Sequence, residues 1–301
     1  MRILISGSTG LIGRHLMTAL RASGSTVVPL VRNGEASGTV HWDPAGKALN
    51  PDLVSGFDIV IHLAGEPVAT GLWTAAKRRK IYDSRVDGTR KLAEALAAAK
   101  CPPRMFLSAS GINYYGDRGD TILDETQPLG QGFLAEVCRN WEAAAAPLAG
   151  LARIVHLRIG IVLAEDGGTL PAMLPLFRLG LGGPVAGGRA YVSWITIRDL
   201  VRAITYIVES DRLEGPLNLV SPHPATNREF TIALAKALGR AAILPVPGWA
   251  VRFLLGQLGV ETVLSSVRAV PEKLLRDGFT FHDAHIALAL KSVLAPRVLN
   301  T

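Results

Sequence analysis

The chain has 301 residues, of which 49% are hydrophobic and 19% charged, and its formal net charge is +7. This size allows one large domain or two smaller ones, each with a real core. No apolar run approaches the roughly 18 to 20 residues needed to cross a bilayer, so we expect no membrane partner. The opening stretch MRILISGSTG lacks the basic lead and apolar centre of an export signal. We therefore expect a cytoplasmic protein.

The two cysteines, Cys101 and Cys138, exclude a disulfide framework and a cysteine zinc site, and suit a reducing compartment. The positive charge suggests anionic ligands. The basic run KRRK at 77–80 has no interleaved aromatic residues, which favours a solvated helix face over nucleic-acid binding. The pair His282 and His285 has no further ligands nearby. We expect a small-molecule ligand, no nucleic acid and no metal, in a monomer or homodimer.

Strands and helices alternate along the first two-thirds of the chain. Apolar runs typical of strands buried on both faces are RILISG, TVVPLVR, FDIVIHLAG, RMFLSAS and RIVHLRIGIVL. The helical patterns between them are IGRHLMTALRASG, DGTRKLAEALAAAK and EVCRNWEAAAAPLA. This order predicts right-handed crossovers and a parallel sheet covered by helices on both faces.

The rhythm changes after about residue 164. The stretch GLGGPVAGGRA (180–190) is typical of a loop, and the chain from about residue 226 is mostly helical in pattern. We predict an α/β fold, a Rossmann-type doubly wound parallel sheet with a small, mainly helical C-terminal lobe on the substrate side. The predicted Rossmann domain spans 1–163, with strands near 190–220 returning to it, and the lobe spans 164–301.

The turn ISGSTGLIG joins the first strand to the first helix and carries three glycines. Gly7 allows the tight turn, Gly10 lets backbone approach a pyrophosphate, and Gly13 lets the helix pack on the strand. The phosphates then lie on the free N–H groups of the helix N-terminus. The residues predicted to bind a dinucleotide here are Gly7, Ser8, Thr9, Gly10, Leu11, Ile12 and Gly13.

The end of the second predicted strand indicates which dinucleotide binds. An NAD site places a carboxylate there for the ribose 2′-hydroxyl, but this chain has Arg32. A guanidinium can hold a 2′-phosphate by charge-assisted hydrogen bonds, so we predict NADP(H) and an NADP-binding domain over 1–163. We expect the backbone of Leu63, Ala64 and Gly65 to lie beneath the adenosine ribose. The alternative is that Arg32 points into water.

Several motifs, in this order, resemble the extended short-chain dehydrogenase/reductase superfamily: GSTGLIG, HLAGEP, SRVDGTRKL, SASGINYYGDRGD, GFLAEVCRNWE, RIGIVL and SWITIRDLV. More narrowly, they resemble its atypical nucleoside-diphosphate-sugar epimerase-like branch, whose members are sometimes called cell-division inhibitors. The tail, with NREF, PVPGWAVR and RAVPEKLLRDGFTF, is similar to the small C-terminal domain of unknown function that marks this branch. The resemblance covers nearly the whole chain. It implies that Ser108, Arg158 and Gly160 lie beside the cofactor.

Typical members of that superfamily use a serine, a tyrosine as acid and a lysine that lowers the tyrosine's pKa, with an asparagine before Gly-Thr. Here the asparagine position holds Arg85, and the tyrosine and lysine positions fall near Leu134 and Cys138. Neither leucine nor cysteine can replace its counterpart. A replacement acid must therefore come from another part of the chain.

The loop after the strand RMFL offers the replacements. We predict Tyr114 or Tyr115 as the acid, Ser110 as the hydrogen-bonding group that orients the carbonyl, and Arg85 as the cation. The alternatives are that Tyr115 only packs beneath the nicotinamide loop, that Glu66 is the acid, or that Lys77 and Arg85 bind an anionic substrate.

These residues predict an NADP(H)-dependent oxidoreductase or epimerase-like enzyme acting on a small carbonyl or nucleotide-sugar-like compound. The alternative from another class is a non-catalytic NADPH-binding sensor or scaffold, which the missing tyrosine and lysine motivate.

Overall fold

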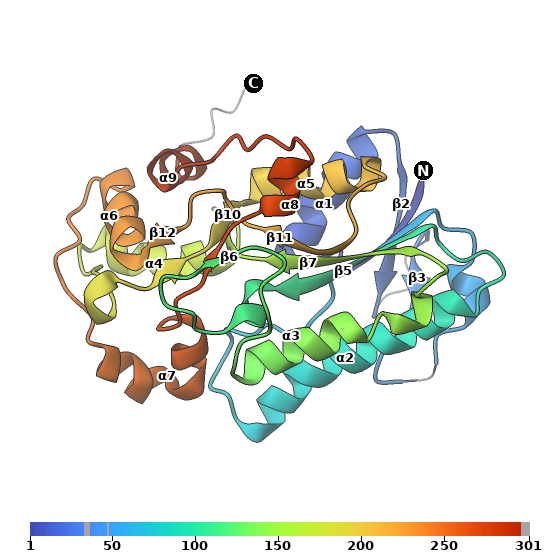
Figure 1. Ribbon diagram of the computed structural model, residues 1–301, viewed down its shortest axis with the longest axis horizontal. Helices are drawn as coiled ribbons and strands as arrows, with labels where there is room; N and C mark the ends of the chain where they lie inside the picture. The colour runs from blue at the N-terminus through green and yellow to red at the C-terminus, as the bar shows by residue number, and fades with distance from the viewer. Residues whose placement is uncertain (33–36, 47, 296–301) are drawn as a thin grey trace.

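In the computed structural model, which describes residues 1–32, 37–46 and 48–295, seven parallel strands form the central sheet (Figure 1). Their spatial order is β11-β7-β5-β4-β1-β2-β3. The strands are β1 (Arg2–Ser6), β2 (Thr26–Val31), β3 (Val40–His41), β4 (Ile59–His62), β5 (Met105–Gly111), β7 (Arg153–Ile159) and β11 (Gly215–Leu219). The prediction of a doubly wound parallel sheet is confirmed.

Helices cover both faces of this sheet. On one face lie α1 (Leu11–Ala22), α5 (Ile197–Glu209) and α8 (Glu272–Arg276), and on the other α2 (Ala75–Ala97) and α3 (Phe133–Ala143) (Figure 1). Successive side chains of a strand point to opposite faces. Accordingly Ile3 and Ile5 of β1 pack in the cluster that contains α1, and Leu4 between them packs with residues of α2.

The chain changes direction across the sheet between β1 and β4. From β1 it winds to β2 and β3 on one side, then crosses to β4 on the other. Ser6 and His62 end these two neighbouring strands in register, and Ser6 Oγ lies 2.6 Å from His62 Nδ1. Open α/β sheets bind their ligands in the crevice at such a point.

The remainder of the chain packs around a separate apolar cluster at one end of the sheet. It contains Trp194 and Leu163 and is covered by α4 (Thr169–Arg178), α6 (Asn227–Ala237) and α9 (Ile286–Val293). Three short strand pairs complete this part: β8 (Ile161–Leu163) with β10 (Trp194–Thr196), β9 (Tyr191–Val192) with β12 (Ala225–Thr226), and β6 (Ile122–Leu123) with β13 (Arg268–Ala269).

Helix α7 (Gly248–Thr262) lies beside the sheet end where α2 and α3 begin (Figure 1). Its backbone is kinked at Gly256, where φ is 55°. Across the described residues, no helix combines the length and apolarity that a membrane span needs.

Candidate active site

The glycine turn forms a cradle of bare backbone between β1 and α1. Gly7 has φ +70°, and a Cβ there would lie 2.8 Å from the carbonyl carbon of Leu63. A Cβ at Gly13 would collide with the carbonyl oxygen of Gly7, and one at Gly10 would lie 3.2 Å from that same atom. The three glycines therefore let β1, β4 and α1 approach more closely than any side chain would allow.

The N-terminus of α1 is left without a side-chain cap. Gly10 is the N-cap residue, and no side chain accepts from the first-turn N–H groups. No acidic residue stands in that first turn. Free N–H groups and the positive end of the helix dipole suit a diphosphate, so this turn fits a dinucleotide.

The other residues predicted in this turn surround the same cradle. Ser8 is buried, Thr9 is exposed, and Leu11 and Ile12 are half-buried. Leu11 also contacts a second segment, because a Cβ at Gly167 or Gly168 would lie 3.2 Å from its methyl groups. Asp166 fastens that segment to α1 through His15, at 2.9 Å. The turn after β8 thus borders the cofactor turn.

Arg32 lies exposed directly after β2, at the edge of the described segment. Glu66, which follows the HLAG stretch, pairs with Lys77 at 2.7 Å. The hydrogen bond from Lys77 lowers the pKa of Glu66, and the charges of Lys77, Lys80 and Arg32 lower it further. An ionised Glu66 is a poor proton donor at neutral pH, so the structure favours a structural role for Glu66 over an acidic one.

Arg85 reaches from α2 to the backbone after β4. A Cβ at Gly65 would lie 3.2 Å from the guanidinium carbon of Arg85, and Arg85 Nη1 donates to the Glu66 carbonyl at 2.8 Å. The guanidinium also lies 5.0 Å from the ring centre of Trp141. Burial lowers the pKa of Arg85, but an arginine keeps its charge in proteins.

The two positions where a tyrosine and a lysine are missing lie buried on α3. Leu134 and Cys138 are each 5% exposed, and Cys138 Sγ lies 3.6 Å from the place of a Cβ on Gly111. Burial, with the nearby Glu142 charge, raises the pKa of Cys138 to about 11. The Arg85 cation lies close enough to Cys138 to oppose that rise. A cation from α2 therefore lies near the position that lacks the lysine on α3.

Ser110 belongs to a buried charged cluster. Its hydroxyl donates to Glu142 Oε1 at 2.8 Å. Arg158 holds the same carboxylate with two nitrogens, Nε at 2.8 Å and Nη2 at 2.9 Å. Because the O–H of Ser110 donates its hydrogen bond to Glu142, the Ser110 oxygen is available as an acceptor toward a ligand.

Tyr114 and Tyr115 have different surroundings. Tyr115 is fully buried, and its hydroxyl donates to Asn218 Oδ1 at 2.8 Å and accepts from Arg158 Nη1 at 3.0 Å. Burial raises the pKa of Tyr115 to about 12. Tyr114 is half-buried, with the Arg158 guanidinium 3.5 Å from its ring centre. Of the two predicted acids, only Tyr114 has a surface that a ligand can reach.

The remaining residues predicted to bind the cofactor, Ser108, Arg158 and Gly160, offer mainly their backbone to a ligand. Ser108 is fully buried in β5, where it is in register with His62 of β4. Gly160 follows β7, and a Cβ there would lie 2.7 Å from the Ser193 carbonyl oxygen. The side chain of Arg158 points into the charged cluster with Glu142, so only its backbone is left to face a cofactor.

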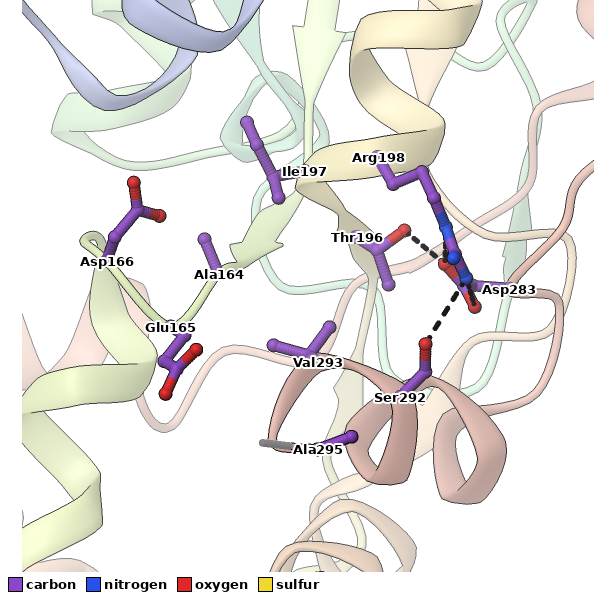
Figure 2. Close-up of a pocket in the computed structure, with 10 residues that line it drawn as sticks. All are labelled: Ala164, Glu165, Asp166, Thr196, Ile197, Arg198, Asp283, Ser292, Val293 and Ala295. Carbon is purple, nitrogen blue, oxygen red and sulfur yellow. Dashed lines mark hydrogen bonds and ion pairs between the residues drawn. The ribbon is translucent and has the colours of Figure 1, made fainter. Parts of the chain in front are cut away.

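A cavity of about 290 Å³ lies between the turn after β8 and the start of α5 (Figure 2). Three of its polar side chains bind one another: Asp283 accepts from Thr196 at 2.8 Å and from Arg198 Nη2 at 2.7 Å. Asp166, on its rim, is held by His15. None of the predicted catalytic residues lines it, and we assign it no ligand.

Three residues of the site region were not predicted: Glu142, Asn218 and Glu261. Arg158 offered a signal for Glu142, because an arginine inside an apolar strand requires a buried carboxylate partner. Asn218 is likewise a polar residue inside an apolar strand. No feature of the sequence indicated that Glu261 belongs to the site, because it lies 128 residues from Phe133, whose N–H it binds.

Comparison with known proteins agrees with this geometry. Residues 3–219 match the NAD dependent epimerase/dehydratase family, and residues 246–293 match a domain of unknown function, DUF1731. An epimerase family protein of Mycobacterium leprae is 39% identical over 291 residues, which cover 96% of this chain and 94% of that protein.

Two solved structures are similar at 34% identity. The human epimerase family protein SDR39U1, solved with NADPH, superposes with a TM-score of 0.90 over 97% of this chain and 99% of that one. A nucleoside-diphosphate sugar epimerase of Corynebacterium glutamicum gives 0.80 over 96% of this chain and 57% of that longer one. Together with the glycine cradle, these matches support nicotinamide-cofactor binding. The chain belongs to the NAD dependent epimerase/dehydratase family, and it carries the DUF1731 segment at its C-terminal end.

Proposed function

We propose that this chain is an NADP(H)-dependent oxidoreductase or epimerase-like enzyme acting on a small carbonyl or nucleotide-sugar-like compound in the cytoplasm. The observation that carries the proposal is the position of Arg85. Its guanidinium lies against Gly65 and near Cys138. A positive charge therefore lies beside the protein backbone that we expect to contact the cofactor, although α3 has no lysine. The NADPH of the human relative supports the choice of cofactor.

The residues of the glycine cradle would hold the dinucleotide, with Arg32 binding the 2′-phosphate and Gly65 beneath a ribose. When bound, NADP(H) would supply a hydride to a carbonyl carbon or accept one from an alcohol carbon. Tyr114 donates the proton to the carbonyl oxygen during reduction. The Arg158 cation over its ring stabilises the phenolate that this transfer leaves. Ser110 accepts a hydrogen bond from a substrate hydroxyl and so orients it.

A second function has its own support. In a non-catalytic NADPH-binding sensor the cofactor site is kept and the proton donor is lost. The buried Leu134 and Cys138, and the hydroxyl of Tyr115 enclosed by Arg158 and Asn218, agree with such a loss. The two functions differ in one observable, which is whether a hydride ever leaves the bound cofactor.

The test is hydride transfer from NADPH deuterated at C4, incubated with the protein and a panel of aldehydes, ketones and nucleotide-sugar ketones. We expect deuterium on a product carbon. The Tyr114→Phe variant should transfer about 100-fold more slowly, the usual contribution of a general acid, with NADPH affinity unchanged. Tyr191→Phe is the matched control. Deuterium that stays on the cofactor with every carbonyl would favour the sensor.

A further inference from the structure

One end of the molecule exposes apolar side chains where a solvated surface is expected. More than half of the large, exposed apolar side chains among the described residues lie in segments 167–198 and 230–260, which together make up about a fifth of the chain. The members used below, called the apolar face, are Leu179 (72% exposed), Leu181 (49%), Ile243 (73%), Trp249 (72%), Phe253 (84%) and Leu254 (66%).

These side chains come from segments that lie side by side. Arg240 Nε donates to the carbonyl of Arg178 at 2.8 Å, which joins the end of α4 to the segment after α6. The Ala186 amide donates to the Val246 carbonyl at 2.9 Å, directly before α7. Figure 1 shows α4 and α7 at the same end of the molecule. The apolar face therefore spans neighbouring elements.

The exposed side of helix α7 carries large apolar side chains beside the polar Arg252 and Gln257. Of its 15 residues, Val251, Leu258 and Gly259 are buried, while Trp249, Phe253 and Leu254 protrude. Large apolar side chains that gather on the exposed side of a helix mark a surface that contacts a partner or a membrane.

The charged side chains within these two segments are all basic, and Glu261 in the last turn of α7 is held by the N–H groups of Phe133 and Leu134. Neither segment contains an aspartate or glutamate, and each contains three basic residues. Arg178, Lys236, Arg240 and Arg252 are exposed, and no ion pair joins them to a carboxylate of the described residues. A symmetric dimer would place this face against its own copy, cation against cation, which disfavours a second copy as the cover. A cover with negative charge complements these exposed cations.

We propose that the apolar face docks on an anionic phospholipid surface, with Trp249, Phe253 and Leu254 inserted among the acyl chains and the arginines at the headgroups. Tryptophan, phenylalanine and leucine flanked by arginine are the residues that bind helices to such interfaces. The lack of an apolar run long enough to span a bilayer does not bear on a helix that lies in the interface. This inference is independent of the proposed catalysis.

Flotation with phosphatidylcholine vesicles, with and without phosphatidylglycerol, tests the proposal on the full chain. We expect binding to the anionic vesicles and little to the neutral ones. Trp249 provides a second readout, because Trp42, Trp141 and Trp194 are buried and Trp73 is half-buried. Its emission should shift to the blue when the anionic vesicles are added.

Two variants separate the apolar and charged contributions. The triple change Trp249→Ser, Phe253→Ser, Leu254→Ser should weaken vesicle binding by about tenfold or more, since burial of even one such side chain is worth that much. Arg178→Gln, Arg240→Gln, Arg252→Gln should remove the preference for anionic lipid. The matched controls are Leu53→Ser, Ile122→Ser, Leu151→Ser, which are about half exposed elsewhere, and Arg90→Gln, Arg139→Gln.

Retained NADPH affinity and circular dichroism show that each variant is folded. Absence of the wild-type protein from the floated anionic vesicles would overturn the proposal. So would concentration-dependent dimerisation that the triple serine variant abolishes, because a second copy would then cover the face. Equal binding to neutral vesicles would contradict the role given to the arginines.

Discussion

Arg85 extends from α2 to the backbone that follows β4. The superfamily that the sequence resembles keeps its cation on the helix that corresponds to α3, where this chain has Cys138, and we propose that Arg85 of α2 supplies the cation instead. The long arginine side chain crosses to Gly65, where the absence of a Cβ leaves room for the guanidinium. Trp141 supports it from the other side.

Because His62 is buried, the free energy of unfolding should fall as the solution becomes acidic. Burial lowers the pKa of His62 from 6.5 to about 4. As the pH falls below 6.5, His62 binds a proton in the unfolded chain but stays neutral in the folded chain until the pH nears 4. The free energy of unfolding therefore decreases. The loss should reach about 3 kcal/mol near pH 4. Urea unfolding at pH 7 and pH 5 should show this dependence, and His62→Asn should reduce it.

The control for His62 is His41→Asn, because His41 is exposed at the edge of the sheet. That variant should keep the full pH dependence. If His62→Asn and the wild type lost equal stability on acidification, another group would be responsible.

Tyr115 contributes to stability through its hydroxyl. Tyr115→Phe would leave Asn218 Oδ1 and Arg158 Nη1 each without a buried partner, which costs about 1 to 3 kcal/mol. We expect a lower urea midpoint for Tyr115→Phe and an unchanged midpoint for Tyr114→Phe, for which no hydroxyl partner is found among the described residues. Equal midpoints for the two variants would contradict the assignment of Tyr115 to a structural role.

At the scale of elements, α7 and α3 are joined by a carboxylate. Glu261 near the end of α7 accepts from the N–H groups of Phe133 at 3.0 Å and Leu134 at 2.7 Å, which begin α3. Gly132 precedes α3 with φ 115° and offers no side-chain cap. The C-terminal segment therefore supplies the cap that α3 lacks, and so fixes the helix that packs against Ser110 and its loop.

Removal of this cap should be measurable. Glu261→Ala should lower the free energy of unfolding by about 1 kcal/mol, as loss of an N-cap does. Glu94→Ala, an exposed position on α2, is the control and should have little effect. A Glu261→Ala variant as stable as the Glu94→Ala control in urea would show that the bonds to α3 contribute nothing.

At the scale of the whole molecule, cofactor binding should stabilise the folded chain. A ligand at 100 times its dissociation constant adds about 2.7 kcal/mol. For a chain of this size that corresponds to a rise of about 5 °C in the unfolding temperature. We expect NADPH to give this rise at a lower concentration than NADH, as measured by thermal unfolding over a titration of each nucleotide.

Arg32→Glu should erase the preference for NADPH, because a carboxylate repels the 2′-phosphate and accepts from a 2′-hydroxyl. Arg90→Glu makes the same charge change on the exposed side of α2 and should keep the preference. If neither nucleotide raised the unfolding temperature of the wild type, the glycine turn would be architecture alone.

The order of strands and helices and the glycine turn could be read from the sequence, because each depends on local constraints. Alternation of β-branched runs with helical patterns determines a parallel sheet, and the spacing of Gly7, Gly10 and Gly13 determines a backbone cradle. The absence of tyrosine and lysine on α3 was likewise visible in the residues themselves.

Only the tertiary structure decided which charged and hydroxyl groups meet. Glu142 with Arg158, Tyr115 with Asn218, and Glu261 with α3 are contacts between elements far apart in the chain. Such contacts depend on packing angles and side-chain reach, which no local pattern encodes. The sequence by itself therefore determined the nucleotide-binding framework, and the packing of the turn 112–115 against β7 and β11 decided that the Tyr115 hydroxyl is buried while Tyr114 stays partly exposed.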